Sequence, residues 1–521
     1  MVGLTFSSVL SLMAAAATSV SAYQYPNIPA DKTTPTQTRL SFQSLNAVSV
    51  AWNTYEKLAQ SCVAYGTSPS SLDKRICSSN SDTYTTSRTW FNNVILPNLT
   101  PSTTYYYKIE STNSTTLSFK SAHAPGDDAS FSVNAVIDMG VYGADGYTTT
   151  MKRDIPYIPP SLTHSTIEQL VSSKDEYDFV IHPGDFAYAD DWFLRPQNLL
   201  DEKDAYAAIT ELFFDQLSYV SSIKPYMAGP GNHEAACQEV KYYQGACPEG
   251  QYNFTDYRVR FGPNMPTTFP SQSSDAAAKA NASAANSLAL PPFWYSYDYG
   301  MAHFVSIDTE TDFPNAPDTS KLDAGPYGRS NQQLEFLKAD LASVDRTVTP
   351  WVIVMGHRPW YSTGGSDNIC SECQAAFEDL FYEYGVDLFV AGHVHNLQRQ
   401  QPTYKGTADS AGLNNPKAPW HIVAGAAGNI EGLSSAGTKP AYNAFVDDSH
   451  NGYARLTFQD KNNLKVDMIH STNGEVLDSA TLFKKHNEAF VRQPVAASSA
   501  ASATKSTLLG SLFGGVLKRD V

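Results

Sequence analysis

Short apolar runs divided by serine, threonine, asparagine and proline fill the first quarter of the chain. Six of these runs have the length of β-strands: residues 39–42, 47–53, 62–66, 88–96, 103–110 and 116–120. Short strands separated by polar turns at this spacing are typical of a β-sandwich. This part of the chain contains no cluster of catalytic side chains, so we expect it to serve in packing or in presenting the rest of the protein.

From residue 131 onward the pattern changes to apolar strands that alternate with segments of helical periodicity. Apolar residues recur at helical spacing in four segments: residues 163–173, 204–221, 330–344 and 372–384. This alternation predicts parallel strands joined by crossover helices. We therefore expect a layered α/β domain, reached through a linker at residues 125–128. An Ala/Ser-rich stretch, residues 271–287, is interpreted as a surface insertion.

Five apolar runs end in glycine-containing turns that carry a carboxylate, an amide or an imidazole. The residues concerned are Asp138, Asp185, Tyr188, Asn232, His233, His357, His393 and His395. Open α/β sheets bind ligands at the carboxyl ends of their strands, where such turns meet. Each turn alone is an ordinary turn sequence, and a Gly-His pair can be no more than a turn with a solvated imidazole. Their joint occurrence at five strand ends favours a single metal site.

Taken in order, these turns resemble the five sequence blocks of the purple acid phosphatases, a family of metallophosphoesterases. The blocks read Asp138-x-Gly140, Gly184-Asp185-x-x-Tyr188, Gly231-Asn232-His233-Glu234, Val354-x-x-His357 and Gly392-His393-x-His395. Tyr188 in the second block separates this family from other metallophosphoesterases. The resemblance covers roughly residues 37–483. It implies a fibronectin type III-like domain before the catalytic one, and residues 99–105 resemble the tyrosine corner of such domains, whose phenol bonds back to the upstream backbone.

The resemblance also implies a binuclear metal centre with seven protein ligands. Asp138, Tyr188 and His395 would bind Fe(III); Asn232, His357 and His393 would bind a divalent metal; Asp185 would bridge the two. Hard Fe(III) favours oxygen donors such as phenolate, whereas imidazole and amide ligands suit a borderline divalent ion. The divalent metal could be Zn, Fe or Mn. A metal-bound hydroxide would then attack phosphorus in line.

His233, next to the ligand Asn232, is the candidate general acid, with Glu234 as its expected orienting partner. The alternative is a structural histidine beside the site. Many relatives carry further histidines soon after the Val-x-x-His block, but residues 358–367 contain none here. The range of leaving groups therefore stays open. The glycine-rich stretch at residues 425–432 resembles a family loop that lines the site.

The composition of the chain argues against some classes of function. The 521 residues carry a net charge of -16, which argues against nucleic-acid binding because such surfaces cluster lysine and arginine. Charged residues make up only 17% and hydrophobic residues 42%, so the chain should be globular. An acidic protein that acts on phosphate esters needs local positive charge, which we expect the metals to supply.

The ends of the chain and its sequons indicate secretion. Residues 1–22 are predicted to be a signal peptide, with a buried N-terminal helix as the alternative. Elsewhere no apolar run reaches the roughly 20 residues of a membrane span. Sequons at Asn98, Asn113, Asn253 and Asn281 are consistent with a secreted glycoprotein, extracellular or associated with a cell wall. The tail after residue 494 contains a short version of a GPI signal, but we favour a flexible or processed tail.

The six cysteines form three couples that are close in sequence. They are Cys62 with Cys77, Cys237 with Cys247, and Cys370 with Cys373. An oxidising compartment favours disulfides over thiol chemistry. Six cysteines allow 15 pairings, so the local pairing is a preference. A redox or zinc site at Cys370-Ser371-Glu372-Cys373 is disfavoured because no second cysteine pair or thioredoxin-like context accompanies it.

These observations predict four segments and one activity. The segments are a signal peptide (1–22), a fibronectin type III-like β-sandwich (23–125), a metallophosphoesterase catalytic domain (126–494) and a flexible or processed tail (495–521). We expect a secreted acid phosphatase that hydrolyses small phosphate monoesters, with inositol phosphates among the open substrates. A wall protein with structural metal is disfavoured, because seven ligands shared by two ions leave coordination positions open. A phosphodiesterase or nucleotide pyrophosphatase of the same superfamily is disfavoured by Tyr188.

Overall fold

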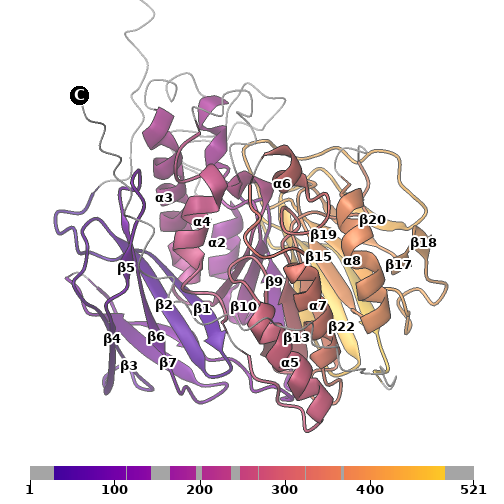
Figure 1. Ribbon diagram of the computed structural model, residues 1–521, viewed down its shortest axis with the longest axis horizontal. Coiled ribbons are helices and arrows are strands. Elements are labelled where there is room, and N and C mark those ends of the chain that lie inside the picture. Colours follow the sequence, from indigo (N-terminus) through magenta and orange to yellow (C-terminus); the bar gives the residue numbers. More distant parts are fainter. Residues whose placement is uncertain are drawn as a thin grey trace, which may run out of the picture.

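The structure is a computed structural model that describes residues 28–112, 114–141, 165–194, 202–235, 247–267, 269–322, 324–364 and 369–486. The expected signal peptide, the tail and Cys237 lie outside these residues. Figure 1 shows a small β domain beside a larger domain in which helices flank sheets. This agrees with the predicted fold class, a β-sandwich followed by a layered α/β domain.

The N-terminal domain contains two four-stranded antiparallel sheets. One has the order β1(Thr36–Ser44), β2(Ala47–Thr54), β6(Trp90–Leu96) and β5(Ser81–Asp82); the other has β4(Lys74–Ser78), β3(Ser61–Gly66), β7(Thr104–Ile109) and β8(Leu117–Lys120). Trp52, Val94 and Tyr107 are among the side chains buried between them. The tyrosine corner is present, because the backbone N–H of Thr100 donates to Tyr105 Oη at 2.9 Å. Each of the six predicted strands forms.

The second domain, which is predicted to be the catalytic one, is built on two larger mixed sheets. The first has the order β11(Tyr226–Gly229), β10(Phe179–Pro183), β9(Phe131–Ala135), β21(Gly452–Phe458), β22(Asn463–His470) and β23(Val476–Phe483). The second has β12(Tyr295–Tyr299), β13(Ala302–Ser306), β14(Trp351–Met355), β15(Leu388–Ala391), β19(Trp420–Ala424), β16(Leu397–Gln400) and β20(Asn443–Asp447). Aromatic rings join them: the Phe304 centroid lies 5.4 Å from that of Phe179 and 5.8 Å from that of Phe458. The core of the domain therefore lies between the sheets.

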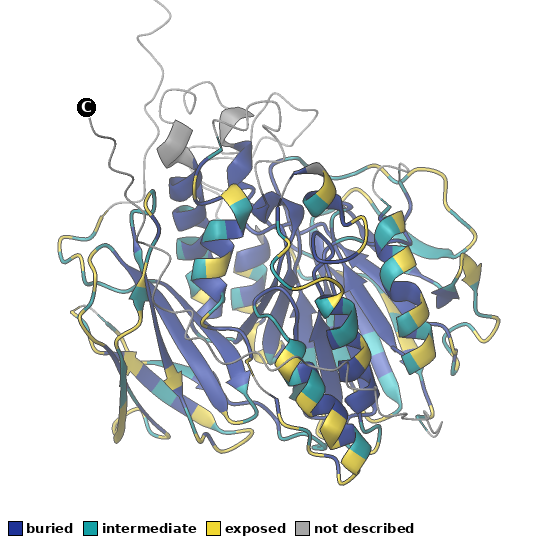
Figure 2. Ribbon diagram, viewed as in Figure 1, coloured by how far each residue is buried: buried dark blue, intermediate teal, exposed yellow. Residues whose placement is uncertain are grey.

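Helices cover the outer faces of this pair of sheets. α2(Ser165–Ser172) and α3(Glu202–Ser221) lie on the side of the first sheet, whereas α5(Ala276–Leu288), α7(Gln332–Ser343) and α8(Ser371–Tyr384) lie on the side of the second (Figure 1). Exposed residues follow the outer faces of these helices, while the central strands are buried (Figure 2). The shorter elements are η1(Lys174–Glu176), η2(Ala189–Leu194), η4(Asn232–Glu234), η6(Tyr252–Phe254), α4(Thr255–Phe261), α6(Pro317–Lys321), β17(Thr403–Tyr404) and β18(Thr407–Ala408).

The Ala/Ser-rich stretch is an ordered helix, and the prediction of a surface insertion is wrong for one of its faces. α5 packs against α7 through the small buried side chains Ala278, Ala282 and Ala285. Asn281 lies on the same face, only 2% exposed, and its Nδ2 donates to the carbonyl of Ala342 at 3.2 Å. Alanines at helical spacing let two helices approach closely. In a stretch composed mostly of alanine and serine, this buried face gives no clear hydrophobic periodicity, so the sequence did not reveal it.

Two of the three predicted disulfides lie within the described residues and are formed. Cys62–Cys77 joins β3 to β4, and Cys370–Cys373 closes the start of α8. The third predicted pair includes Cys237, which is not described. In the part of the chain that the structure describes, no helix combines the length and the apolar character that crossing a membrane requires.

Candidate metal centre

The predicted site residues follow strands of both large sheets. Asp138 follows β9, Asp185 and Tyr188 follow β10, and Asn232 and His233 follow β11. His357 follows β14, and His393 and His395 follow β15. Because β9 to β11 are parallel, as are β14 and β15, the turns meet at the carboxyl ends of both sets of strands. All eight residues are thereby brought into one region.

Asp138 and His395 lie against the phenol of Tyr188. Its Oη lies 2.9 Å from Asp138 Oδ1 and 2.8 Å from His395 Nε2. Asp138 is fully buried, and Tyr188 is 2% exposed. An oxygen-rich set of phenol, carboxylate and imidazole suits a hard cation.

A second group gathers around His357. Its Nε2 lies 3.0 Å from Asn232 Oδ1 and 2.9 Å from Asp185 Oδ2. One donor atom from each of Asp185, His357 and His393 lies within 4.8 Å of the others. Amide and imidazole donors with one carboxylate suit a borderline divalent cation.

The charges of this cluster of side chains fit a bound cation. Burial raises the pKa of Asp138 to about 8, and the neighbouring Asp185 carboxylate acts in the same direction. Burial, Asp138 and Asp185 also raise the pKa of the Tyr188 phenol well above its ordinary value. Among the described residues, no lysine or arginine forms an ion pair with either carboxylate. A bound metal ion would lower the pKa of both groups, because it favours the deprotonated form of each ligand.

The backbone is held in an unusual conformation at four of the seven proposed ligands. Asp138, Asp185, Tyr188 and His393 have positive φ angles of 61°, 57°, 52° and 65°. Such left-handed positions are uncommon for residues other than glycine and cluster at functional sites. Close packing accompanies them, since a Cβ added at Gly392 would collide with the carboxylate of Asp138. The turns therefore hold the donors close together.

Asp190, and not Glu234 as predicted, orients His233. The ring nitrogen Nδ1 of His233 lies 2.8 Å from Asp190 Oδ1, and its Nε2 faces Asp185 Oδ2 at 3.9 Å. Glu234 instead accepts from the backbone N–H groups of Asp185, Phe186 and Gly231 at 2.8, 2.8 and 3.0 Å. Its carboxylate is thus already occupied in fixing the turn that carries Asp185. Asp190 had no motif to mark it, although it follows Tyr188 by two residues.

The glycine-rich loop at residues 425–432 lines the site, as its resemblance implied. Asn429 Nδ2 donates to the carbonyl of Asp138 at 3.2 Å. His395 Nδ1 lies 3.1 Å from the carbonyl of Gly432 and 3.9 Å from Glu431 Oε2. The loop therefore fixes the ring of His395, and Glu431 is a residue near the site that sequence patterns did not identify.

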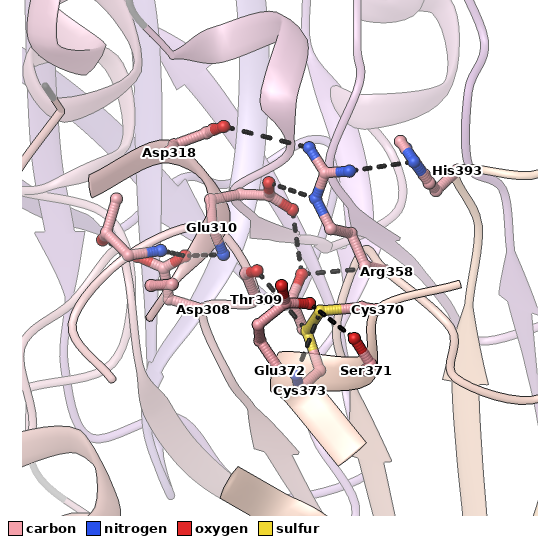
Figure 3. The surroundings of a disulfide bond; sticks show 12 residues. Asp308, Thr309, Glu310, Asp318, Arg358, Cys370, Ser371, Glu372, Cys373 and His393 are labelled. Atoms are coloured by element: carbon pink, nitrogen blue, oxygen red, sulfur yellow. Dashed lines mark hydrogen bonds and ion pairs between the residues drawn. A yellow bond between two sulfur atoms is a disulfide. The ribbon is translucent and has the colours of Figure 1, made fainter. Parts of the chain in front are cut away.

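Arg358 is a second residue at the site that sequence patterns did not identify. Its Nη1 lies 2.9 Å from His393 Nε2, and its Nε lies 2.6 Å from Glu310 Oε2. Figure 3 shows its guanidinium between these two partners. Only its place directly after His357 could have drawn attention to it.

Three segments of the chain match known protein families. Residues 35–121 match the N-terminal domain of purple acid phosphatases, and residues 163–397 match calcineurin-like phosphoesterases. Residues 418–479 match the C-terminal segment described as iron/zinc purple acid phosphatase-like protein C. The first match lies on the β-sandwich, and the second includes β10, β11, β14 and β15 with the proposed ligands that follow them. The third lies on the last strands of the two sheets, while Asp138, which follows β9, precedes the second match.

Individual relatives cover most of the chain. It is 57% identical over 496 residues to acid phosphatase A of Cryphonectria parasitica, which covers 93% of this chain and 98% of that protein. It is 32% identical over 506 residues to an acid phosphatase of Aspergillus ficuum, covering 76% of each. Among solved structures, the purple acid phosphatase PPD1 from yellow lupin (Lupinus luteus) seeds has the same fold. That structure matches with a TM-score of 0.62 and 23% identity over 87% of this chain and 75% of the other.

Proposed function

The chain belongs to the purple acid phosphatase family and is an acid phosphatase, and from this premise we propose that it hydrolyses phosphate monoesters at a centre of Fe(III) and divalent Zn, Fe or Mn. The observation that carries the proposal is the position of Asp185. Its Oδ2 lies 2.9 Å from His357 Nε2 and 3.4 Å from Tyr188 Oη. One carboxylate oxygen is thus within reach of both groups of donors, as a bridging ligand must be.

The donors divide between the two proposed metals by their chemistry. The ligands proposed for Fe(III) are Asp138, Tyr188 and His395, and those for the divalent ion are Asn232, His357 and His393, with Asp185 shared. When bound, the two ions would lower the pKa of a water molecule and neutralise the phosphoryl oxygens. The mutual repulsion of two cations makes the shared carboxylate the ligand on which both depend.

His233 would supply the proton that the leaving alkoxide needs. Burial alone would lower the pKa of this imidazole, but the carboxylates of Asp190 and Asp185 raise it well above its ordinary value. The 2.8 Å contact with Asp190 occupies Nδ1, so Nε2 is the nitrogen that faces the reacting group. Its ring also lies against that of Tyr188, with centroids 4.1 Å apart and the ring planes tilted by 36°. These contacts would keep the acid in place before the substrate arrives.

We also propose that the enzyme is secreted. The predicted signal peptide at residues 1–22 and the sequons motivate this proposal. Two disulfides in the described residues support it, since such bonds persist in oxidising compartments. Cutting at the predicted position would leave Tyr23 as the first residue, which N-terminal sequencing of protein from the culture medium would detect. Protein that is found only inside the cell would contradict secretion.

Elemental analysis of three purified proteins tests the bridging role of Asp185. We expect two metal ions per chain in the wild type, one of them iron. Asp185→Asn should lose both ions, because it removes the shared carboxylate, whereas His357→Ala should lose mainly the divalent ion. Equal metal content in Asp185→Asn and the wild type would contradict the proposed centre.

A further inference from the structure

Arg358 brings a cation to the edge of the proposed metal centre. It follows His357 directly, and its backbone N–H donates to Thr309 Oγ1 at 2.9 Å. The side chain is 13% exposed, so the guanidinium is largely shielded from bulk water. Its neighbour His393 is only partly buried.

Two buried carboxylates aim this guanidinium. Nε lies 2.6 Å from Glu310 Oε2, and Nη2 faces Asp318 Oδ1 at 3.9 Å (Figure 3). The side chains of Glu310 and Asp318 are 0% and 3% exposed, so neither can move away without losing a buried charge partner. The guanidinium is therefore fixed on one side by carboxylates, and its Nη1 is directed to the other side, toward His393.

Metal binding would remove the acceptor that Nη1 contacts. Nη1 lies 2.9 Å from His393 Nε2, and an N–H of arginine can only donate, so Nε2 must offer its lone pair. If His393 binds a metal through Nε2, that lone pair is used by the metal. If it binds through Nδ1, the ring proton resides on Nε2, and two donors face each other. In both cases Nη1 loses its hydrogen-bond acceptor, and it remains beside the metals, largely shielded from bulk water.

We propose that Arg358 binds a phosphoryl oxygen of the substrate, and of the inorganic phosphate product, on the side of the divalent metal. This rests on the proposed function. An anionic oxygen is the natural partner for a pre-aimed guanidinium that has lost its acceptor. The contact also supplies fixed positive charge at a site whose protein carries a net charge of -16. Arg358 stands in the stretch after His357 where no histidine is present.

The rival explanation is that Arg358 only neutralises Glu310 and Asp318. Both explanations predict that removal of Arg358 harms the enzyme, so activity alone does not separate them. They differ in the affinity for inorganic phosphate. A purely structural arginine should affect folding and metal content, whereas a phosphate-binding arginine should weaken phosphate binding in protein that retains its metals.

Titration calorimetry with inorganic phosphate on the metal-loaded proteins tests the proposal. Arg358→Gln should keep two metals per chain and bind phosphate about 10- to 100-fold more weakly, the range expected for losing a charge-assisted hydrogen bond. Arg358→Lys keeps the charge but loses the fork of donors, so its loss should be smaller. Arg399→Gln is the matched control, since Arg399 is 14% exposed and pairs with Asp478 away from the site. It should bind phosphate like the wild type.

Unchanged phosphate affinity in Arg358→Gln overturns the proposal. If this variant loses metal, the same titration is made on the charge-balanced double variant Glu310→Gln/Arg358→Gln. A phosphate affinity equal to that of the wild type then overturns the proposal, and a weakened phosphate affinity supports it. If neither holds its metals, Arg358→Lys decides by the same criterion. Failure of the proposed function is distinguishable, because the wild type itself would then lack two metals or fail to bind phosphate.

Discussion

At the scale of single residues, Asp190 determines which nitrogen of His233 is left to face the predicted metal ligands. Its carboxylate lies 2.8 Å from Nδ1, which leaves Nε2 directed toward Asp185. An aspartate in this position would act on His233 as a positioning residue, because its carboxylate fixes the orientation of the ring. The role proposed for His233 therefore depends on a residue outside the sequence motif.

A series of leaving groups separates proton donation by His233 from simple phosphate binding. An alkyl ester needs protonation of its poor leaving group, whereas nitrophenyl phosphate needs little. His233→Ala should lower kcat for alkyl phosphates by about 10²- to 10⁴-fold and affect nitrophenyl phosphate far less. Asp190→Asn should show the same selectivity with a smaller loss. Parallel dependences on leaving-group pKa in wild type and His233→Ala, with metal content intact, would exclude the general-acid role.

The sequence predicted some residues of the site and missed others for a definable reason. Asp138, Asp185 and Tyr188 follow apolar strands at fixed offsets, so strand ends and motifs located them. Asp190 and Arg358 act through contacts that depend on side-chain direction. Glu310, for example, reaches Arg358 across 48 residues of sequence, and no local pattern encodes that distance. Adjacency in sequence also gave a wrong prediction. Glu234 lies beside His233 in sequence, but its carboxylate accepts hydrogen bonds from backbone N–H groups and not from the imidazole.

At the scale of elements, α5 shows where periodicity was insufficient. Its alanines and serines indicated low complexity, yet one face is buried against α7. In the β-sandwich, the strands β4 and β5 were not predicted for a similar reason. Lys74 and Arg75 in β4, and Ser81 and Asp82 in β5, provide no apolar alternation. They form at the edges of their sheets, where pairing alone defines a strand.

The burial of Asn281 predicts that its sequon carries no glycan. The Nδ2 atom that would carry the sugar donates to Ala342 between two packed helices. Because a glycan there would force α5 away from α7, protein that folds should lack it. In protein secreted from a eukaryotic host, mass spectrometry of peptides should find Asn281 unmodified, and the exposed Asn98 serves as the control site. Substantial occupancy at Asn281 would contradict the packing of this helix.

At the scale of the whole molecule, the β-sandwich and the catalytic domain share buried polar contacts. Arg260 in α4 is 1% exposed and pairs with Asp256 at 2.8 Å. Its Nη1 also donates to Gln37 of β1 at 2.7 Å. A second link joins Tyr107 Oη to the carbonyl of Ser222 at 2.7 Å. The domain order could be predicted from sequence, but these links join residues more than 100 positions apart and could not.

Loss of Arg260 should therefore destabilise both domains together. Arg260→Met leaves the buried Asp256 without its cation, which costs on the order of 3–5 kcal/mol. We expect a single unfolding transition in calorimetry for the wild type and for this variant, at lower temperature in the variant. The double variant Asp256→Leu/Arg260→Met should recover part of the loss. Two separate transitions in the wild type would show that the domains are independent.

A buried histidine should make the protein more stable in acid. His303 lies 2.7 Å from Asp298 and 2.9 Å from Asp340. Burial alone would lower the pKa of His303, but these carboxylates raise it to about 10. The unfolded value is about 6.5, so the stabilisation is complete below that pH and disappears as the pH rises toward 10. His303→Gln should thus lower the free energy of unfolding by about 2–4 kcal/mol more at pH 5 than at pH 10, as measured by denaturant unfolding. An equal cost at both values would contradict this.

The visible spectrum of the oxidised, iron-replete enzyme tests the proposed Fe(III) centre most directly. Tyr188 as an Fe(III) ligand predicts a phenolate-to-iron charge-transfer band, so the wild type should be coloured. Tyr188→Phe should lose the band. Tyr107→Phe, which removes a buried phenol of the β-sandwich, should keep it. A colourless wild type with a full complement of iron would contradict the account.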